Sequence, residues 1–443
     1  MNNYLTIKNS KRNLTLNEDL PFHNWYNFVL GYPPHLVQHF INKFNITGSH
    51  IVLDPFSGTG TTPIECMKNG IKSIGIEPND VVLFASQVKS SIFLEPSTLQ
   101  EYLSFIVYSA KETFSKNSVY DDSKMLFLPT SELKPIQVDA DITLTEEQFS
   151  LIPQGFISEL PLKKFMIIKN IINKIREKHI RNFFLLSLVN ITIKYGSNIS
   201  FGPEIYKSKI ETEDFGILSF FVENTMRMIA ELESSRNKIF VEPMLIKGDS
   251  RYLDKCLQNE FLNQVDFVIT SPPYPNEKDY TRSTRLESVL LGFIKSKEEL
   301  RSLKQNLLRS NSRNVFVNDD DGDFVWHIKE IQIIAEEIER RRIEMNKTSG
   351  FEKLYHKIMR HYFGGMYLHL KSLKPFLKKG AKLAYVVGDQ ASYFQVHIPT
   401  ASLLTVIAKE LGYRNVGIEL FRTRLSTRTK KYLDENILIL ENI

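Results

Sequence analysis

The stretch Ile51-Val52-Leu53-Asp54-Pro55-Phe56-Ser57-Gly58-Thr59-Gly60 decides the fold of this chain. A short apolar run enters a turn that contains two glycines, residues 63–69 have a helical pattern, and residues 73–77 form a second apolar run that ends in an acid. Pro63 suits the first turn of a helix, where a missing N–H costs little. The order strand, glycine loop, helix, strand predicts one βαβ unit of a doubly wound α/β sheet.

Further strand patterns lie at residues 244–246, 265–269 and 381–387, and residues 415–421 and 436–440 are spaced like a closing hairpin. The patterns between 94 and 243 are mostly helical, and residues 295–350 carry two helical stretches around an acidic turn. We therefore expect a core built from residues 20–93 and 244–443. The segment 94–243 would be a large helical insertion, and 295–350 a smaller one.

Composition excludes several classes of protein. Of 443 residues, 42% are apolar and 24% are charged, as in ordinary globular domains and unlike disordered or fibrous chains. No apolar run reaches the roughly 18 residues of a membrane helix, and the polar first residues do not resemble a signal peptide, so we expect a cytoplasmic protein. With two cysteines, neither a disulfide framework nor a thiolate zinc site is expected, and no metal site is predicted.

The glycine loop after the first strand lets the backbone pass close to a ligand. No Gly-Lys-Ser/Thr follows it, so it is not a triphosphate-binding loop, and it lacks the three-glycine dinucleotide spacing. Glu77 lies 23 residues after Asp54, close to the distance at which an acid meets ribose hydroxyls in nucleotide-binding folds.

The tetrapeptide Ser271-Pro272-Pro273-Tyr274 follows an apolar strand directly. Two consecutive prolines end the strand ladder and stiffen the backbone. They leave carbonyl oxygens without a local donor, next to an aromatic ring. A rigid pair of acceptors beside a stacking ring suits a planar substrate that bears an amino group.

These two motifs resemble those of the nucleic-acid amino-methyltransferases that use S-adenosylmethionine (SAM). The stretch 54–60 is similar to the cofactor loop of that family, and 271–274 to its catalytic tetrapeptide, in the serine-first form typical of cytosine-N4 DNA methyltransferases. The resemblance implies a Rossmann-like, mostly parallel seven-stranded sheet. It also implies catalytic roles for Ser271, Pro272, Pro273 and Tyr274. The positions that would bind SAM are Tyr32, Pro33, Asp54, Pro55, Phe56, Gly58, Gly60, Thr61, Glu77, Asp249 and Ser250.

The resemblance further implies double-stranded DNA as partner, with the target base flipped into the site. Between residues 160 and 210, ten Lys or Arg residues stand against two acids, in a chain whose net charge is +5. A solvated helix face explains such an excess as well as DNA does. We take Lys174, Arg176 and Arg181 from this segment as candidate DNA-binding residues, followed by Arg282 and Arg285 beyond the catalytic turn.

Several alternatives stay open. In many cytosine-N4 enzymes the tetrapeptide precedes the cofactor loop, whereas here it follows 217 residues later. An adenine-N6 DNA enzyme or an RNA base methyltransferase of the same fold is therefore the nearest rival, and a catalytically silent nucleic-acid binder is the rival from another class. A partner restriction endonuclease or defence system is also left open.

Overall fold

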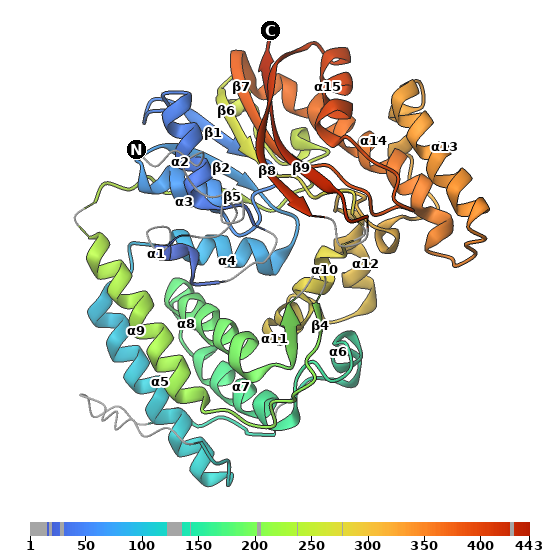
Figure 1. Cartoon of the computed structure of the whole chain (residues 1–443). Coiled ribbons are helices and arrows are strands. Elements are labelled where there is room, and N and C mark those ends of the chain that lie inside the picture. The colour runs from blue at the N-terminus through green and yellow to red at the C-terminus, as the bar shows by residue number, and fades with distance from the viewer. Residues whose placement is uncertain are drawn as a thin grey trace.

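One sheet of seven strands organises the part of the molecule drawn at the top of Figure 1, in the order β5-β2-β1-β6-β7-β9-β8. The computed structural model describes residues 16, 20–26, 31–121, 135–141, 143–201, 205–236, 238–276, 278–425 and 429–443. The strands are β1 (Ile51–Asp54), β2 (Lys72–Ile76), β5 (Met244–Ile246), β6 (Val265–Thr270), β7 (Leu377–Gly388), β8 (Tyr413–Leu425) and β9 (Tyr432–Asn442). Strands β1, β2, β5, β6 and β7 pair in parallel, while β9 runs antiparallel to both β7 and β8. The predicted doubly wound, mostly parallel α/β sheet is confirmed.

Helices cover both faces of this sheet. On one face, α2 (Pro34–Lys43) and α3 (Thr61–Lys68) pack on β1, β6, β7 and β9 through residues such as Phe40 and Cys66. On the other face lie α14 (Tyr355–Leu373) and α15 (Thr400–Glu410), whose apolar side chains join Leu383 and Leu438 of the sheet. This two-faced cover explains why residues 267–269 of β6 and 383–387 of β7 are continuously apolar and do not alternate.

A second apolar cluster belongs mainly to the helices drawn below the sheet in Figure 1. Its helices are α1 (Leu20–His23), α4 (Asp80–Ser90), α5 (Pro96–Lys116), α6 (Glu146–Leu151), α7 (Glu159–Ile172), α8 (Lys178–Ile191), α9 (Ile217–Ser235) and α11 (Arg285–Leu291). The largely helical character predicted for this region is confirmed. The sequence did not predict the small hairpin of β3 (Ile199–Phe201) and β4 (Ile205–Lys207).

The predicted smaller insertion contains α12 (Lys297–Gln305) and α13 (Lys329–Glu344), which flank the acidic turn. A short α10 (Tyr280–Ser283) precedes α11, directly after the Ser-Pro-Pro-Tyr turn. In a parallel sheet the carboxyl ends of the strands share one edge, where ligands bind. Because β9 runs the other way, its first residues reach that same edge, together with the end of β8.

Candidate active site

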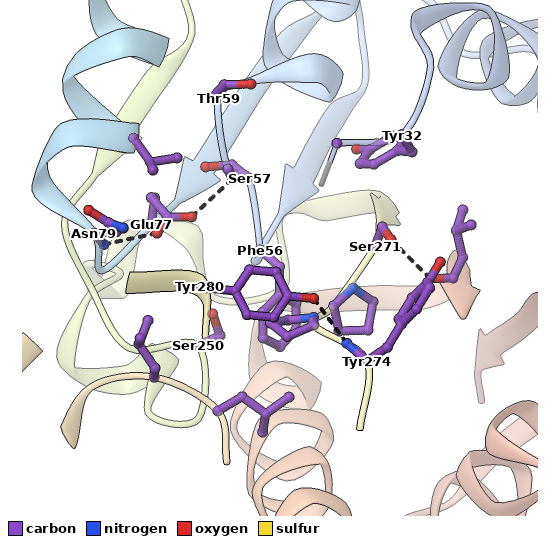
Figure 2. A pocket seen from close by; sticks show the side chains of 18 of the residues that line it. Tyr32, Phe56, Ser57, Thr59, Glu77, Asn79, Ser250, Ser271, Tyr274 and Tyr280 are labelled. Carbon is purple, nitrogen blue, oxygen red and sulfur yellow. Dashed lines mark hydrogen bonds between the residues drawn. The ribbon is translucent and has the colours of Figure 1, made fainter. Parts of the chain in front are cut away.

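A cavity lies at the carboxyl-terminal edge of the sheet, with the glycine loop on one side and the Ser-Pro-Pro-Tyr turn on the other (Figure 2). Most residues singled out from the sequence line it together: Tyr32, Pro33, Phe56, Gly58, Thr61, Glu77, Asp249, Ser250, Ser271, Pro272, Pro273 and Tyr274. Residues more than 200 positions apart in the chain thus form one site.

The two glycines of the loop, Gly58 and Gly60, have different surroundings. Gly58 lines the cavity at φ +51°, and a Cβ built on it would meet no atom of the described residues within 4 Å. Gly60, at φ +84°, does not line the cavity, and its added Cβ would lie 2.2 Å from Ser86 Oγ of α4. The open space therefore lies beside Gly58, whereas Gly60 permits close packing of the loop against a helix.

Asp54 and Pro55 lie beneath the cavity and support its wall. The buried Asp54 carboxylate accepts hydrogen bonds from Thr270 Oγ1 (2.6 Å), Tyr32 Oη (2.9 Å) and the Phe56 N–H (3.1 Å). Burial raises the pKa of Asp54 to about 6, against the opposing effect of these donors. The Pro55 carbonyl accepts a hydrogen bond from Ser250 Oγ, which ties the loop after β5 to the loop after β1.

Glu77 stands at the end of β2 and holds the glycine loop. Its carboxylate accepts from the Gly58 N–H at 3.0 Å and from the Asn79 N–H at 2.8 Å. Burial raises the pKa of Glu77 to about 7, although the two backbone donors act in the opposite direction. Asn79 also lines the cavity, and its buried Oδ1 has no hydrogen-bond partner within the described ranges.

Asp249 reaches the cavity, but Arg251 occupies its carboxylate. The guanidinium donates from Nη2 at 2.6 Å and from Nε at 3.1 Å to Asp249. The same side chain donates to Asp321 at 2.7 Å and to the Gln305 carbonyl at 2.6 Å. The loop after β5 is thereby joined to the smaller insertion, and the acidic turn predicted there has a structural role.

The Ser-Pro-Pro-Tyr turn is fixed by hydrogen bonds to β7 and β9. Ser271 Oγ donates to the Val386 carbonyl at 3.1 Å, and Tyr274 Oη donates to Glu435 Oε1 at 2.8 Å. Glu435 in turn pairs with Arg422, its partner across the β8–β9 ladder. A Cβ on Gly388 would lie 2.9 Å from the Tyr274 ring, so that ring rests against the backbone at the end of β7. Burial and the Glu435 carboxylate raise the pKa of Tyr274 well above its usual value, so the phenol is neutral.

The candidate DNA-binding residues do not line this cavity. Lys174 and Arg176 are exposed between α7 and α8, whereas Arg181 donates to the carbonyls of Ile175 (2.8 Å) and Arg176 (3.4 Å). Beyond the Ser-Pro-Pro-Tyr turn, Arg285 donates to Thr281 Oγ1 at 2.8 Å and Arg282 lies on α10.

One part of the basic-surface hypothesis is wrong. Lys164, counted in the excess of positive charge, is fully buried and pairs with Asp121 at 3.1 Å and Asp214 at 2.6 Å. A count of charges along the chain cannot separate a buried ion pair from a surface lysine.

Sequence reasoning missed several residues that line the cavity. The most informative are Asn79, Tyr280, Arg422 and Glu435. Asn79 follows Glu77 closely, at the position where a loop enters a helix, and this was a usable signal. The acid Glu435 at the start of an apolar strand was another, whereas nothing in the sequence paired it with Arg422.

No helix in the described ranges is long and apolar enough to cross a membrane. Within the same ranges, no group of three or more His, Cys, Asp or Glu side chains is placed to hold a metal ion.

The mostly parallel sheet, with the glycine loop and the Ser-Pro-Pro-Tyr turn on one cavity, is similar to the architecture of the amino-methyltransferases. The family model for N6/N4 enzymes, described as DNA methylase, matches residues 7–85. This match and the relatives below support the amino-methyltransferase family for the chain, and a DNA methyltransferase of the N6/N4 group.

Curated relatives extend the similarity over most of the chain. The type II methyltransferase M.BsoBI of Geobacillus stearothermophilus is 26% identical over 450 residues, which cover 92% of this chain and 82% of the relative. M.AvaI of a Nostoc species is 23% identical over 418 residues, covering 90% and 80%. M.MjaII of Methanocaldococcus jannaschii is 38% identical, but over 85 residues, or 19% of this chain and 15% of the relative.

Proposed function

We propose that this protein transfers a methyl group from SAM to the exocyclic N4 amine of a cytosine flipped out of double-stranded DNA. The observation that carries the proposal is that the glycine loop and the Ser271–Tyr274 turn line one cavity. A methyl donor held by the loop and an amine held by the turn would then meet without water between them. Orientation of this kind accounts for much of the rate gain in such transfers.

The loop side of the cavity fits SAM. Gly58 leaves open space for a ligand, and the Glu77 oxygens, each with one backbone donor, keep lone pairs for ribose hydroxyls. Asn79 Oδ1, which has no partner among the described residues, would accept a hydrogen bond from an amino group. Tyr32 and Pro33 line the same cavity and would cover the methionine end. SAM supplies a methyl group that is already activated on sulfur, so no protein nucleophile is required.

Ser271 is arranged to accept a hydrogen bond from the substrate. Its hydroxyl donates to the Val386 carbonyl, and its oxygen keeps lone pairs that can accept from a further donor. An exocyclic amine is a weak nucleophile because its lone pair is delocalised into the ring. The Ser271 oxygen and the Pro272 carbonyl would accept its two hydrogens, which favours a pyramidal nitrogen with a free lone pair. Fixed acceptors of this kind need no reorganisation during the reaction.

Tyr274 would stack on the flipped base. The Glu435 hydrogen bond and the contact with Gly388 hold its ring in one orientation. A pre-oriented ring loses little entropy when a base stacks on it, and such stacking is worth about 1–3 kcal/mol per base.

Cytosine is the proposed base because the tetrapeptide begins with serine, and DNA is the proposed polymer because the matching family model is described as DNA methylase. We assign residues 20–93 and 244–443 to the catalytic core, 94–243 to DNA recognition and 295–350 to a smaller insertion. Lys174, Arg176, Arg181, Arg282 and Arg285 stay the candidates for backbone contacts. The relatives are type II methyltransferases, so a companion restriction endonuclease is part of the proposal.

Sequencing DNA from cells that express the protein tests this function, with a method that reads N4-methylcytosine and N6-methyladenine in context. We expect N4-methylcytosine at one short recurring sequence. Cells that express the Tyr274→Ala protein should lack the mark. N6-methyladenine at a recurring sequence instead would overturn the choice of base, and unmodified DNA would overturn the function.

A further inference from the structure

The wall of the cavity behind Tyr274 carries a charged pair that the chemistry above does not use. Arg422 of β8 and Glu435 of β9 both line the cavity, and they face each other across the ladder as an ion pair. Glu435 also accepts the Tyr274 hydrogen bond at 2.8 Å. The guanidinium therefore lies two hydrogen bonds away from the ring on which the base would stack.

Among the described residues, the ion pair with Glu435 occupies only the Nε donor of Arg422. Its side chain is 19% exposed, and within the described ranges its one hydrogen bond runs from Nε to Glu435. The terminal Nη1 and Nη2 groups have no partner there. Arginine presents its N–H groups as a planar fork, and a fork held at Nε by a carboxylate points its remaining donors in a fixed direction.

The edges of the two candidate bases differ in what they offer such a fork. Next to its amine, cytosine carries two acceptors, N3 and O2, whereas adenine carries one acceptor, N1, followed by a C–H group. Enzymes read flipped bases through hydrogen bonds to this edge. A planar two-donor group matches cytosine and would leave one donor unpaired against adenine, which is costly in a dry pocket.

We propose that Arg422 is the residue that selects cytosine, by donating hydrogen bonds from its terminal nitrogens to N3 and O2 of the flipped base. Glu435 accepts hydrogen bonds from both Arg422 and Tyr274. One carboxylate therefore orients the ring that stacks on the base and the guanidinium that bonds to its edge. This inference rests on the proposed function and adds the residue that sets its base specificity.

The test combines a protein change with a base change. Single-turnover methyl transfer is measured for wild-type and Arg422→Met proteins, on duplexes that carry cytosine or 3-deazacytosine at the mapped target. The analogue keeps the amine but replaces N3 with C–H. We expect Arg422→Met to slow transfer to cytosine about tenfold to a hundredfold, as for loss of a charged hydrogen bond. On the analogue it should slow transfer much less, because the hydrogen bond to N3 is already absent.

Two controls test whether Arg422 bonds to the edge of the base or only helps to hold the Tyr274 ring in place. Tyr274→Phe cuts the link to Glu435 without touching Arg422, and it should slow cytosine and 3-deazacytosine by equal factors. SAM affinity of the Arg422→Met protein should match wild type. If Arg422→Met slows both bases equally, or neither, the proposal is overturned.

A wrong proposed function can be told apart from a wrong role of Arg422. Nucleosides from the wild-type reaction are identified first, and N6-methyladenine as product would reject the cytosine assignment before any variant is compared. With N4-methylcytosine as product, the ratio of the two Arg422→Met effects decides the inference alone.

Discussion

Thr270 Oγ1 donates a hydrogen bond of 2.6 Å to Asp54 Oδ1, and each of these residues is the last of its strand. Asp54 precedes the glycine loop directly, and Thr270 precedes the Ser-Pro-Pro-Tyr turn. This buried bond therefore joins the two halves of the cavity at the ends of two paired strands, although the residues are 216 positions apart in the chain.

Thr270→Val should lower the free energy of unfolding and loosen the link between the two halves of the cavity. The change leaves the buried Asp54 without its shortest hydrogen bond, which costs about 1–3 kcal/mol in the free energy of unfolding. Urea denaturation followed by circular dichroism measures this loss. Thr270→Ser keeps the hydroxyl and is the matched control, so equal stability of the Val and Ser proteins would contradict the role given to the bond.

Gly58→Asp should abolish measurable SAM binding in a folded protein. The new side chain enters the open space beside the loop, and the residue must keep φ +51°. Gly70→Asp is the matched control, because Gly70 has φ +68°, equally open surroundings and no part in the cavity. Calorimetric titration should show normal affinity for Gly70→Asp, and normal affinity for Gly58→Asp would refute the placement of the cofactor.

The SAM affinity of the wild-type protein should increase as pH rises through about 7. The pKa of Glu77 is raised to about 7 by burial, so this carboxyl is protonated below that pH and ionised above it. The ionised form accepts hydrogen bonds from ribose hydroxyls more strongly. Titration at pH 6 and pH 8 should differ by about tenfold or less in Kd. The Glu77→Gln protein should bind more weakly at pH 8 and show a flat profile, and an equally steep profile in it would assign the effect to another group.

The same carboxyl affects stability with the opposite sign. A folded-state pKa of about 7, above the usual 4.5, means that the stability contribution of Glu77 is fully present below pH 4.5 and is lost as pH rises through 7. In the absence of SAM, Glu77→Gln should therefore reduce the fall in unfolding free energy between pH 5 and pH 8. Bound SAM would offset that fall in the wild type.

Neutralising Lys174 and Arg176 together should flatten the salt dependence of DNA binding, by about one unit of log–log slope for each DNA phosphate that the variant no longer neutralises. Both side chains are exposed, whereas Arg181 also donates hydrogen bonds to carbonyls of the loop between α7 and α8 and is better tested alone. Arg340→Gln with Lys347→Gln in the smaller insertion removes the same charge elsewhere and should leave the slope unchanged. An unchanged slope in the first variant would move the DNA surface to another face.

The sequence predicted the elements that depend on residues close together in the chain, and it did not predict contacts between distant residues. The run from Ile51 to Glu77 has its strands, helix and acid close to where the sequence placed them. The structure then shows Ser271, which follows the parallel strand β6, on the same cavity as the glycine loop. The strand order around β9 and the link from Tyr274 to Glu435, 161 residues away, depend on tertiary packing and have no local signal. The burial of Lys164 was hidden for the same reason, since its partners Asp121 and Asp214 lie in other segments.

Identifying the methylated nucleoside tests the central claim most directly. Purified protein is incubated with SAM and duplex DNA, the DNA is digested to nucleosides, and mass spectrometry measures each methylated product. We predict N4-methylcytosine from the wild-type protein, with product reduced at least tenfold for Ser271→Ala and nearly absent for Tyr274→Ala, while both variants keep wild-type SAM affinity. N6-methyladenine as the sole product, or wild-type rates from both variants, would contradict the account.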